Sequence, residues 1–286
     1  MIQSMTGFGK SLLQLADKKI IIEIKSLNSK AIDLNTRIAQ AYKEKELTLR
    51  KLISDTLERG KIDFTLTVEN TSASSTSTLN EPVVRGYIEQ MRTISPNGPD
   101  VEFLKMAVRM PDALTTPVEE VDEQEFAQIE EQLVLALKQL QAFRSSEGAI
   151  LQKDFELRIR NIQQLLTQVE ALDTERLAAI RSRMERAVEE IRDRVDENRF
   201  EQELIFYLEK LDITEEKVRL ANHLNYFLIT LEEPQSNGRK LGFIAQEIGR
   251  EINTLGSKAN HAQMQQIVVL MKNELEKIKE QVLNIL

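Results

Sequence analysis

Apolar and polar positions alternate in the first seventy residues, which is the period of a half-buried β-strand. Three stretches show this alternation, at residues 20–24, 32–38 and 62–68. Between the last two, residues 42–58 place leucine and isoleucine on one helical face, and Gly60 ends that helix. With a further strand around Gly7 and Gly9, the order strand, strand, strand, helix, strand predicts a mixed sheet packed against a helix.

The second half of the chain instead repeats its apolar residues three and four positions apart, which is typical of α-helices. Residues 126–143, 151–169 and 177–195 each carry such a stripe. We expect the second and third to form a long antiparallel pair that turns near Asp173-Thr174. This pair predicts a long helical hairpin in the middle of the chain.

Three more helices are expected at the C-terminal end. Asp212 and Glu215 resemble a capping box that opens the first, which must end before Pro234. The second covers the stretch GRKLGFIAQEIGREINTLGSKAN at residues 238–260, called the signature segment below. The third has an apolar seam of alternating four- and three-residue steps between residues 264 and 285, which suits packing against another long helix.

These patterns together predict an α+β protein, because the strands and most helices lie in separate parts of the chain. We expect an N-terminal mixed sheet and helix domain at residues 1–145. A long helical hairpin connector is expected at 146–198, and an all-α C-terminal domain at 199–286. Two short helices, at 83–93 and 101–110, are expected inside the first domain.

The signature segment carries a dense polar face beside its apolar stripe, which consists of Phe243, Ile244, Ile248, Ile252 and Leu255. Glu247 and Glu251 stand one helical turn apart, so their carboxylates point the same way. Carboxylate oxygens are ligands for Mg²⁺ or Mn²⁺, so both glutamates are candidate metal ligands and catalytic residues. The alternative is a solvated acidic face that Arg250 and Lys258 balance.

Other polar residues of the C-terminal domain could contact a phosphodiester. His223 is a candidate general acid or base, or else a histidine at the edge of the core. The candidate phosphate contacts are Arg219, Arg239, Lys240, Arg250, Asn253 and Lys258. Any of the cations could pair with a nearby acid instead, as Arg219 would with Glu215 or Glu216. Near the other end, Arg59 and Lys61 flank Gly60 and, with Lys25 and Lys30, could line an RNA entrance or form a solvated edge.

Composition narrows the choice of function. The 286 residues contain no cysteine, which excludes disulfides and thiolate metal sites and fits a reducing cytoplasm. The net charge is −8, but residues 1–70 hold 12 Lys+Arg against 9 Asp+Glu, a local net of +3. An RNA path would therefore use local basic patches, with modest and salt-dependent affinity. No apolar stretch predicts a signal peptide or a membrane span.

Five segments in the same order resemble the YicC/YloC family of bacterial endoribonucleases. These are SMTGFGK at Ser4–Lys10, EIKSLNSKAIDLNTRI at Glu23–Ile38, RKLISDTLERGKID at Arg50–Asp63, EKLDITEEKVRLANHL at Glu209–Leu224 and the signature segment. The resemblance implies a cytoplasmic homo-oligomer, a hexameric ring in the family picture, that cleaves RNA with a divalent metal. The glycines of the first segment lack phosphate-loop spacing, and we expect them to let a strand bend or another backbone approach.

The chain departs from the family pattern at several positions. The family usually has an acid at Gly242, an asparagine at Gly249, an acid near His261 and His-Arg at Ser29-Lys30. The resemblance leads us to expect an endoribonuclease that cleaves single-stranded or loop RNA through metal-activated water. A non-catalytic RNA-binding adaptor and a purely structural helical assembly stay open as alternatives.

Overall fold

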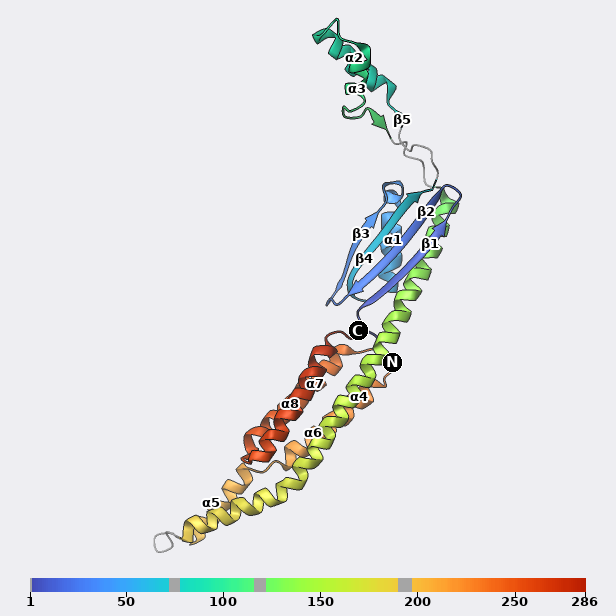
Figure 1. Ribbon diagram of the computed structural model, residues 1–286. Coiled ribbons are helices and arrows are strands. Elements are labelled where there is room, and N and C mark those ends of the chain that lie inside the picture. The colour runs from blue at the N-terminus through green and yellow to red at the C-terminus, as the bar shows by residue number, and fades with distance from the viewer. Residues whose placement is uncertain (1, 72–77, 116–121, 190–196) are drawn as a thin grey trace.

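The computed structural model describes residues 2–71, 78–115, 122–189 and 197–286 (Figure 1). It is an α+β protein, as the sequence pattern predicted. The strands are β1 (Gly7–Gln14), β2 (Lys18–Leu27), β3 (Ile32–Ile38), β4 (Gly60–Asn70), β5 (Thr78–Leu79) and β6 (Leu114–Thr115). The helices are η1 (Gln40–Lys45), α1 (Glu46–Thr56), α2 (Glu81–Ile94), α3 (Asp100–Ala107), α4 (Glu123–Glu189), α5 (Glu197–Lys210), α6 (Thr214–Leu231), α7 (Gly238–Ala259) and α8 (Ala262–Val282).

The N-terminal sheet has the strand order β1-β2-β4-β3, with β3 parallel to β4 and the other neighbours antiparallel. Its buried face carries isoleucines of β2 and the Ile62, Phe64 and Leu66 row of β4. This face packs on α1 and on the first half of α4, which form one core with it. The alternation in the sequence thus gave the correct buried face.

The two glycines of the first segment allow β1 to lie against α4. A Cβ atom on Gly9 would stand 1.9 Å from the carbonyl oxygen of Ala136, a distance that no side chain can occupy. A Cβ on Gly7 would meet Leu140 at 3.0 Å. Both glycines therefore serve close backbone approach, as expected.

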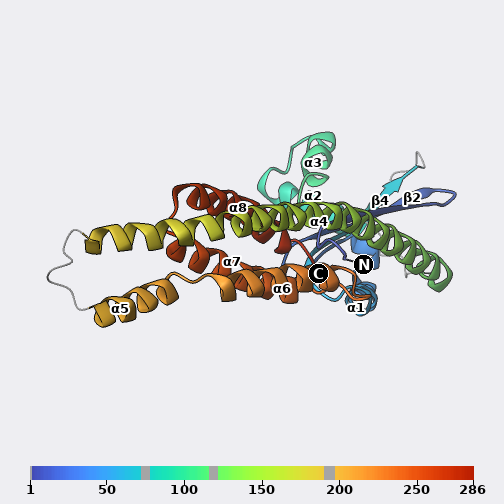
Figure 2. The same cartoon turned by 90° about the horizontal axis from the view of Figure 1, so that it is seen from below.

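One helix, α4, replaces the three that the pattern predicted. Its 67 residues span about 100 Å at 1.5 Å per residue. The turn expected near Asp173-Thr174 is wrong, because the helix continues through both residues. Residues 149–189 contain no proline or glycine. Asp173 is bonded by Arg176 at 2.8 Å and by Lys217 at 2.7 Å. The chain instead returns as α5, which lies beside the far end of α4 (Figures 1 and 2).

The second half of α4 packs on α6 and α8, and α7 completes a separate core between those two helices. The heptad seam of α8 is buried as predicted, against helices of the same chain. Gly242, Gly249 and Gly256 of α7 face α8 at seven-residue intervals, next to Val282, Leu275 and Val268. Their missing side chains bring the two helices together. Phe243 was expected in the core but is exposed, because it lies one position off the buried stripe.

The chain ends meet between the sheet and the C-terminal helices (Figure 1). Ser4 forms an isolated bridge with Ile285, and the Met5 amide donates to the Asn284 carbonyl at 2.8 Å. Asn28, just after β2, donates to the Leu283 carbonyl at 2.6 Å. The two cores are therefore joined by α4 on one side and by paired terminal segments on the other.

The helices α2 and α3 form a small unit with the β5-β6 ribbon beyond the sheet (Figure 1). Its core consists of Val84, Ala107 and Ala113, with Tyr87 and Ile88 packed against it. Both helices were expected, and α3 is shorter than predicted because it ends at Ala107.

Candidate active site

The signature segment forms α7, which lies between α6 and α8. The Asn237 side chain caps its start by accepting from the Lys240 amide at 3.1 Å. Two ion pairs fix its register against α6: Lys258 bonds Glu216 at 2.8 Å, and Lys240 bonds Glu233 just beyond α6. These contacts make α6 and α7 an antiparallel pair with a defined alignment.

In this alignment Glu251 lies at the level of His223 on α6, since each is seven residues from a member of the Lys258–Glu216 pair. Glu251 is only 9 % exposed. Within the described part of the chain, no hydrogen bond or ion pair joins its carboxylate to another group. Its carboxylate oxygens are not among the fully buried, unpartnered atoms of the described residues, so they reach solvent and can accept a cation or a proton donor. His223 is half-buried at the same level.

Glu247 differs from Glu251 in its surroundings. It is 40 % exposed and pairs with Arg250 at 2.7 Å, one turn along the same helix. Arg250 itself is 73 % exposed, so most of its donors face solvent. The two glutamates therefore share a side of α7, but only Glu251 is buried and unbonded. Glu247 would have to leave Arg250 to act beside it.

Three of the predicted phosphate contacts serve structural roles. Lys258 bonds Glu216 and also the Asp212 carbonyl at 3.1 Å. Lys240 bonds Glu233 and lies 5.0 Å from the centre of the Tyr226 ring, and both contacts help raise its pKa. Arg219 pairs with Glu215, the local partner that the sequence offered. Their charges are largely neutralised within the C-terminal helices.

Arg239, Arg250 and Asn253 have exposed side chains. Arg239 is the second residue of α7, whereas Asn253 is near its other end. Asn253 follows Arg239 by 14 residues, which corresponds to about 21 Å along the helix axis. The predicted contacts thus follow the length of α7 and do not form one compact site.

Three of the positions at which the chain departs from the family pattern lie on the α8 side of α7 or at the start of α8. Gly242 and Gly249 face α8, and a Cβ on Gly249 would lie 3.4 Å from Lys279 Nζ. His261 caps α8, where its Nδ1 accepts from the Met264 amide at 3.4 Å. These residues contribute to helix packing and capping.

The residues of one chain fit a divalent ion only as a two-carboxylate site. Among the described residues, no three His, Cys, Asp or Glu side chains gather closely enough to hold a metal. Mg²⁺ commonly uses one or two carboxylates and completes its shell with water and phosphate oxygens. Glu251, with Glu247 turned from Arg250, meets that minimum.

Sequence reasoning did not select two buried groups that the structure brings out. Glu216 is 6 % exposed, and its Oε2 atom has no hydrogen-bond partner although Oε1 bonds Lys258. Arg144 is 2 % exposed, with its Nε unbonded. Both continue an apolar stripe, since Arg144 follows Leu140 by four residues and Glu216 precedes Leu220 by four. A charge in the phase of a buried stripe was the available signal.

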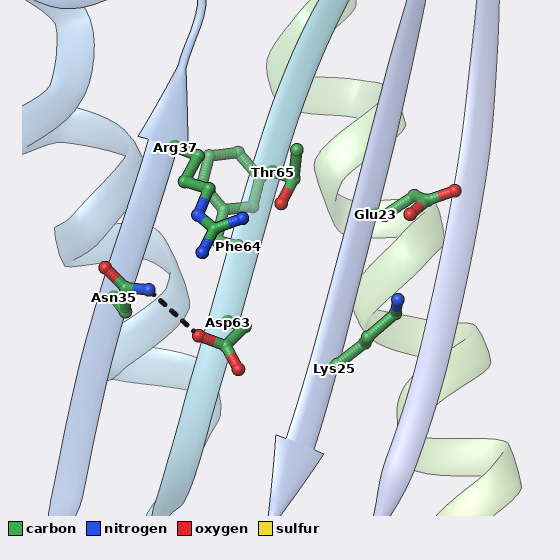
Figure 3. A pocket seen from close by; sticks show the side chains of 7 residues that line it. All are labelled: Glu23, Lys25, Asn35, Arg37, Asp63, Phe64 and Thr65. Atoms are coloured by element: carbon green, nitrogen blue, oxygen red, sulfur yellow. Dashed lines mark hydrogen bonds between the residues drawn. The ribbon is translucent and has the colours of Figure 1, made fainter.

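The open face of the sheet carries a hollow of about 180 Å³, whose lining includes Lys25, a candidate for an RNA entrance, and no candidate catalytic residue (Figure 3). Asp63 accepts from Asn35 at 3.0 Å, and Glu23 bonds Lys10 at 2.8 Å, a contact that lowers the pKa of Glu23. Lys25 and Arg37 add positive charge from β2 and β3. The charges of the lining balance, with Glu23 and Asp63 against Lys25 and Arg37.

Comparison with known proteins shows which family the chain resembles over its whole length. The C-terminal model of the endoribonuclease YicC-like proteins matches residues 169–286, and the N-terminal region model matches residues 2–153. A protein of Clostridioides difficile (strain 630) named "Probable endoribonuclease YicC" is 30 % identical over 290 residues, covering 99 % of both chains. A protein of the same name from Haemophilus influenzae is 29 % identical over 291 residues, covering 100 % of both.

Within the described helices, none is long and apolar enough to cross a membrane. The family matches extend over both halves of the chain, including the sheet, α4 and the α6–α7 pair. The five segments that pointed to the same family lie within these matches. The chain belongs to the YicC-like endoribonuclease family.

Proposed function

We propose that this protein is an endoribonuclease whose chemistry takes place where Glu251 of α7 faces the level of His223 on α6. Family membership supports the reaction class, and both named relatives carry endoribonuclease in their names. The observation that carries the site is the Glu251 side chain, which is 9 % exposed and has no bonded partner among the described residues. Family membership also leads us to propose a cytoplasmic homo-oligomer, with a hexameric ring as the expected form.

Glu251 and Glu247 would hold Mg²⁺ or Mn²⁺ through their carboxylate oxygens. A divalent ion bound there would lower the pKa of a coordinated water and offset charge on the phosphate. Glu251 needs no rearrangement of an existing bond to serve, whereas Glu247 must release Arg250. Removing Glu251 should therefore cost more activity than removing Glu247.

His223 and Arg250 would act on the RNA itself. His223 would donate a proton to the leaving 3′-oxygen as the P–O3′ bond breaks, since an imidazole titrates near neutral pH. Arg250, with most of its donors free, would hold a non-bridging phosphate oxygen. Attack by water in this scheme leaves a 5′-phosphate and a 3′-hydroxyl.

Oligomer formation would gather the scattered cations of α7 from several chains. One support is a row of exposed apolar side chains on α4, at Phe143, Ile150 and Leu157. Their seven-residue spacing places them on one side of the helix, which is suited to packing against a second helix. Multi-angle light scattering of wild type and of Ile150→Glu tests this: we expect the variant to dissociate.

The deciding experiment combines purified protein, a labelled single-stranded RNA and end-group analysis, with Mn²⁺ and with EDTA. Glu251→Gln should lower the cleavage rate by about 100-fold or more, the size expected for a group acting in the transition state. RNA binding in EDTA should be unchanged, because the substituted group does not hold RNA directly. Gln246→Glu, at an exposed site on the same helix, is the control and should cleave like wild type.

Other outcomes select other functions. Binding without cleavage in Mn²⁺ would identify an RNA-binding adaptor, and no binding at low salt would favour a structural assembly. A 2′,3′-cyclic phosphate product that forms equally in EDTA would replace water with the ribose 2′-hydroxyl as nucleophile. A rate that does not change between about pH 5 and 8 would remove His223 from the mechanism.

A further inference from the structure

Three arginines from distant parts of the sequence surround the paired chain ends. Arg59 lies in the loop before β4, Arg144 lies in the middle of α4, and Arg239 is the second residue of α7. Arg59 Nη2 donates to the Ile285 carbonyl at 2.6 Å. Gly238, next to Arg239, packs against that same carbonyl, which a Cβ at this position would approach to 2.4 Å. Arg59 and Arg239 therefore flank one short stretch of backbone.

Arg144 lies beneath Arg59. Its Nη2 donates to the Arg59 carbonyl at 3.3 Å, to Ser26 Oγ at 2.5 Å and to the Met5 carbonyl at 3.4 Å. Gly60, at φ +132°, leaves room for this guanidinium, which would lie 3.3 Å from a Cβ there. The cluster thus joins the sheet, α4 and α7 at one place.

One acid, Glu58, acts on this cluster through its charge without forming an ion pair. None of the three guanidiniums forms an ion pair with a described carboxylate, and all the acceptors of Arg144 are neutral oxygens. Its Nε is buried and has no partner at all. Burial lowers the pKa of Arg59 and of Arg144, and the neighbouring arginine adds to each shift, with Glu58 opposing it. The position is electropositive in a protein of net charge −8.

We propose that Arg59 and Arg239, supported from below by the buried charge of Arg144, bind a backbone phosphate of RNA. Arg239 is exposed and Arg59 half-buried, so both retain donors that can reach a ligand, and paired guanidinium donors match phosphate oxygens. The choice of RNA as the source of the phosphate rests on the proposed function. The site lies at the start of α7, whereas Glu251 is 13 residues along it. A phosphate held here would anchor RNA away from the bond that is cleaved.

The test measures binding in EDTA, so that it does not depend on cleavage. A fluorescein-labelled oligouridine of ten nucleotides is titrated at several salt concentrations with wild type, Arg239→Gln and Arg59→Gln. We expect binding to weaken about five- to tenfold in each variant, as for one lost charge-assisted contact. The slope of log K against log salt should fall by about 0.7 per phosphate contact. Arg109→Gln, at an exposed arginine after α3, is the matched control and should bind like wild type.

A second arm replaces RNA with inorganic phosphate, compared with chloride at equal ionic strength. Phosphate should raise the thermal unfolding midpoint of wild type and of Arg109→Gln by about 2 °C, and Arg239→Gln should lose this shift. Arg239 bonds no described residue, so this variant stays informative if Arg59→Gln fails to fold. Equal RNA affinity in wild type and Arg239→Gln would overturn the proposal.

The two proposals fail differently. If the phosphate shift disappears in Arg239→Gln while RNA affinity is unchanged, the site takes a free anion and RNA is the wrong ligand. If RNA binding weakens as expected but no variant or wild type cleaves RNA in Mn²⁺, the phosphate site stands and the proposed nuclease activity does not.

Discussion

Two arginines of α4 are buried, but only one of them forms an ion pair with a described carboxylate. Arg176 is 1 % exposed and pairs with Asp173 at 2.8 Å, while its other donors reach the carbonyls of Ala259 and Leu211 at 3.2 and 2.9 Å. Arg144 is 2 % exposed and bonds only neutral oxygens among the described groups. Each arginine joins α4 to segments far away in the sequence. Only Arg176 has its charge neutralised where it lies.

Because of this difference, we expect Arg176 to stabilise the fold and Arg144 to belong to the proposed binding site. Lys217 also bonds Asp173, so both oxygens of this carboxylate are bonded to cations. At Arg144 the charges that act on the guanidinium are those of Arg59 and Glu58. A buried charge that lacks a counterion is retained at a cost in stability, which an incoming anion can offset. Function is therefore expected at Arg144 and stability at Arg176.

The largest effect should come from Arg176→Met. The substitution leaves Asp173 buried with Lys217 alone and removes the donors that bond the carbonyls of Leu211, Lys258 and Ala259. The free energy of unfolding should therefore fall by about 3–5 kcal/mol. Urea denaturation followed by helical circular dichroism measures this change. RNA binding in EDTA should stay within twofold of wild type under conditions where the variant is folded. A loss below about 1 kcal/mol would contradict the structural role.

A smaller loss, about 1–2 kcal/mol, should follow from Arg144→Met. Three hydrogen bonds disappear, but an uncompensated buried charge disappears with them, and the two changes partly cancel. Added phosphate should stabilise wild type and not this variant. Melting curves with and without phosphate give the loss of stability in the variant and the stabilisation by phosphate. A loss of stability as large as that of Arg176→Met would remove the contrast between the two sites.

The smallest effect concerns a third arginine of α4, Arg158, whose pair with Glu274 at 3.2 Å is partly exposed. Burial would raise the pKa of Glu274, but hydrogen bonds from Lys277, Asn161 and Arg158 lower it to about 2. Glu274→Gln should therefore cost about 1 kcal/mol near neutral pH.

The pH dependence of that loss follows from the direction of the shift. Because the folded pKa lies below the unfolded value, the stabilisation is complete above about pH 5 and disappears as the pH falls toward 2. Denaturant midpoints of wild type and Glu274→Gln between pH 3 and 7 should converge on the acid side. Parallel curves across this range would show that the carboxylate is not held by these bonds.

Much of the candidate site could be predicted, because helical spacing is visible in the sequence. The spacing correctly identified the signature helix, its neighbour α6 and the buried seam of α8. It did not identify which acid is bonded, since the Glu247–Arg250 pair and the unbonded Glu251 look alike in the sequence. It also misplaced the turn at Asp173, because an aspartate inside a helix becomes acceptable once Arg176 and Lys217 bond it.

The sequence by itself determined the α+β class, the buried face of the sheet, the extent of most C-terminal helices and the family, because each depends on local periodicity or on motifs. Only the tertiary structure decided that one continuous helix carries both cores. It also decided that Lys258 and Lys240 bond acids of the α6 side, and that Arg59, Arg144 and Arg239 meet at the chain ends. Counterions depend on which groups become neighbours in space, and residues that are far apart along the chain carry no local sign of that proximity.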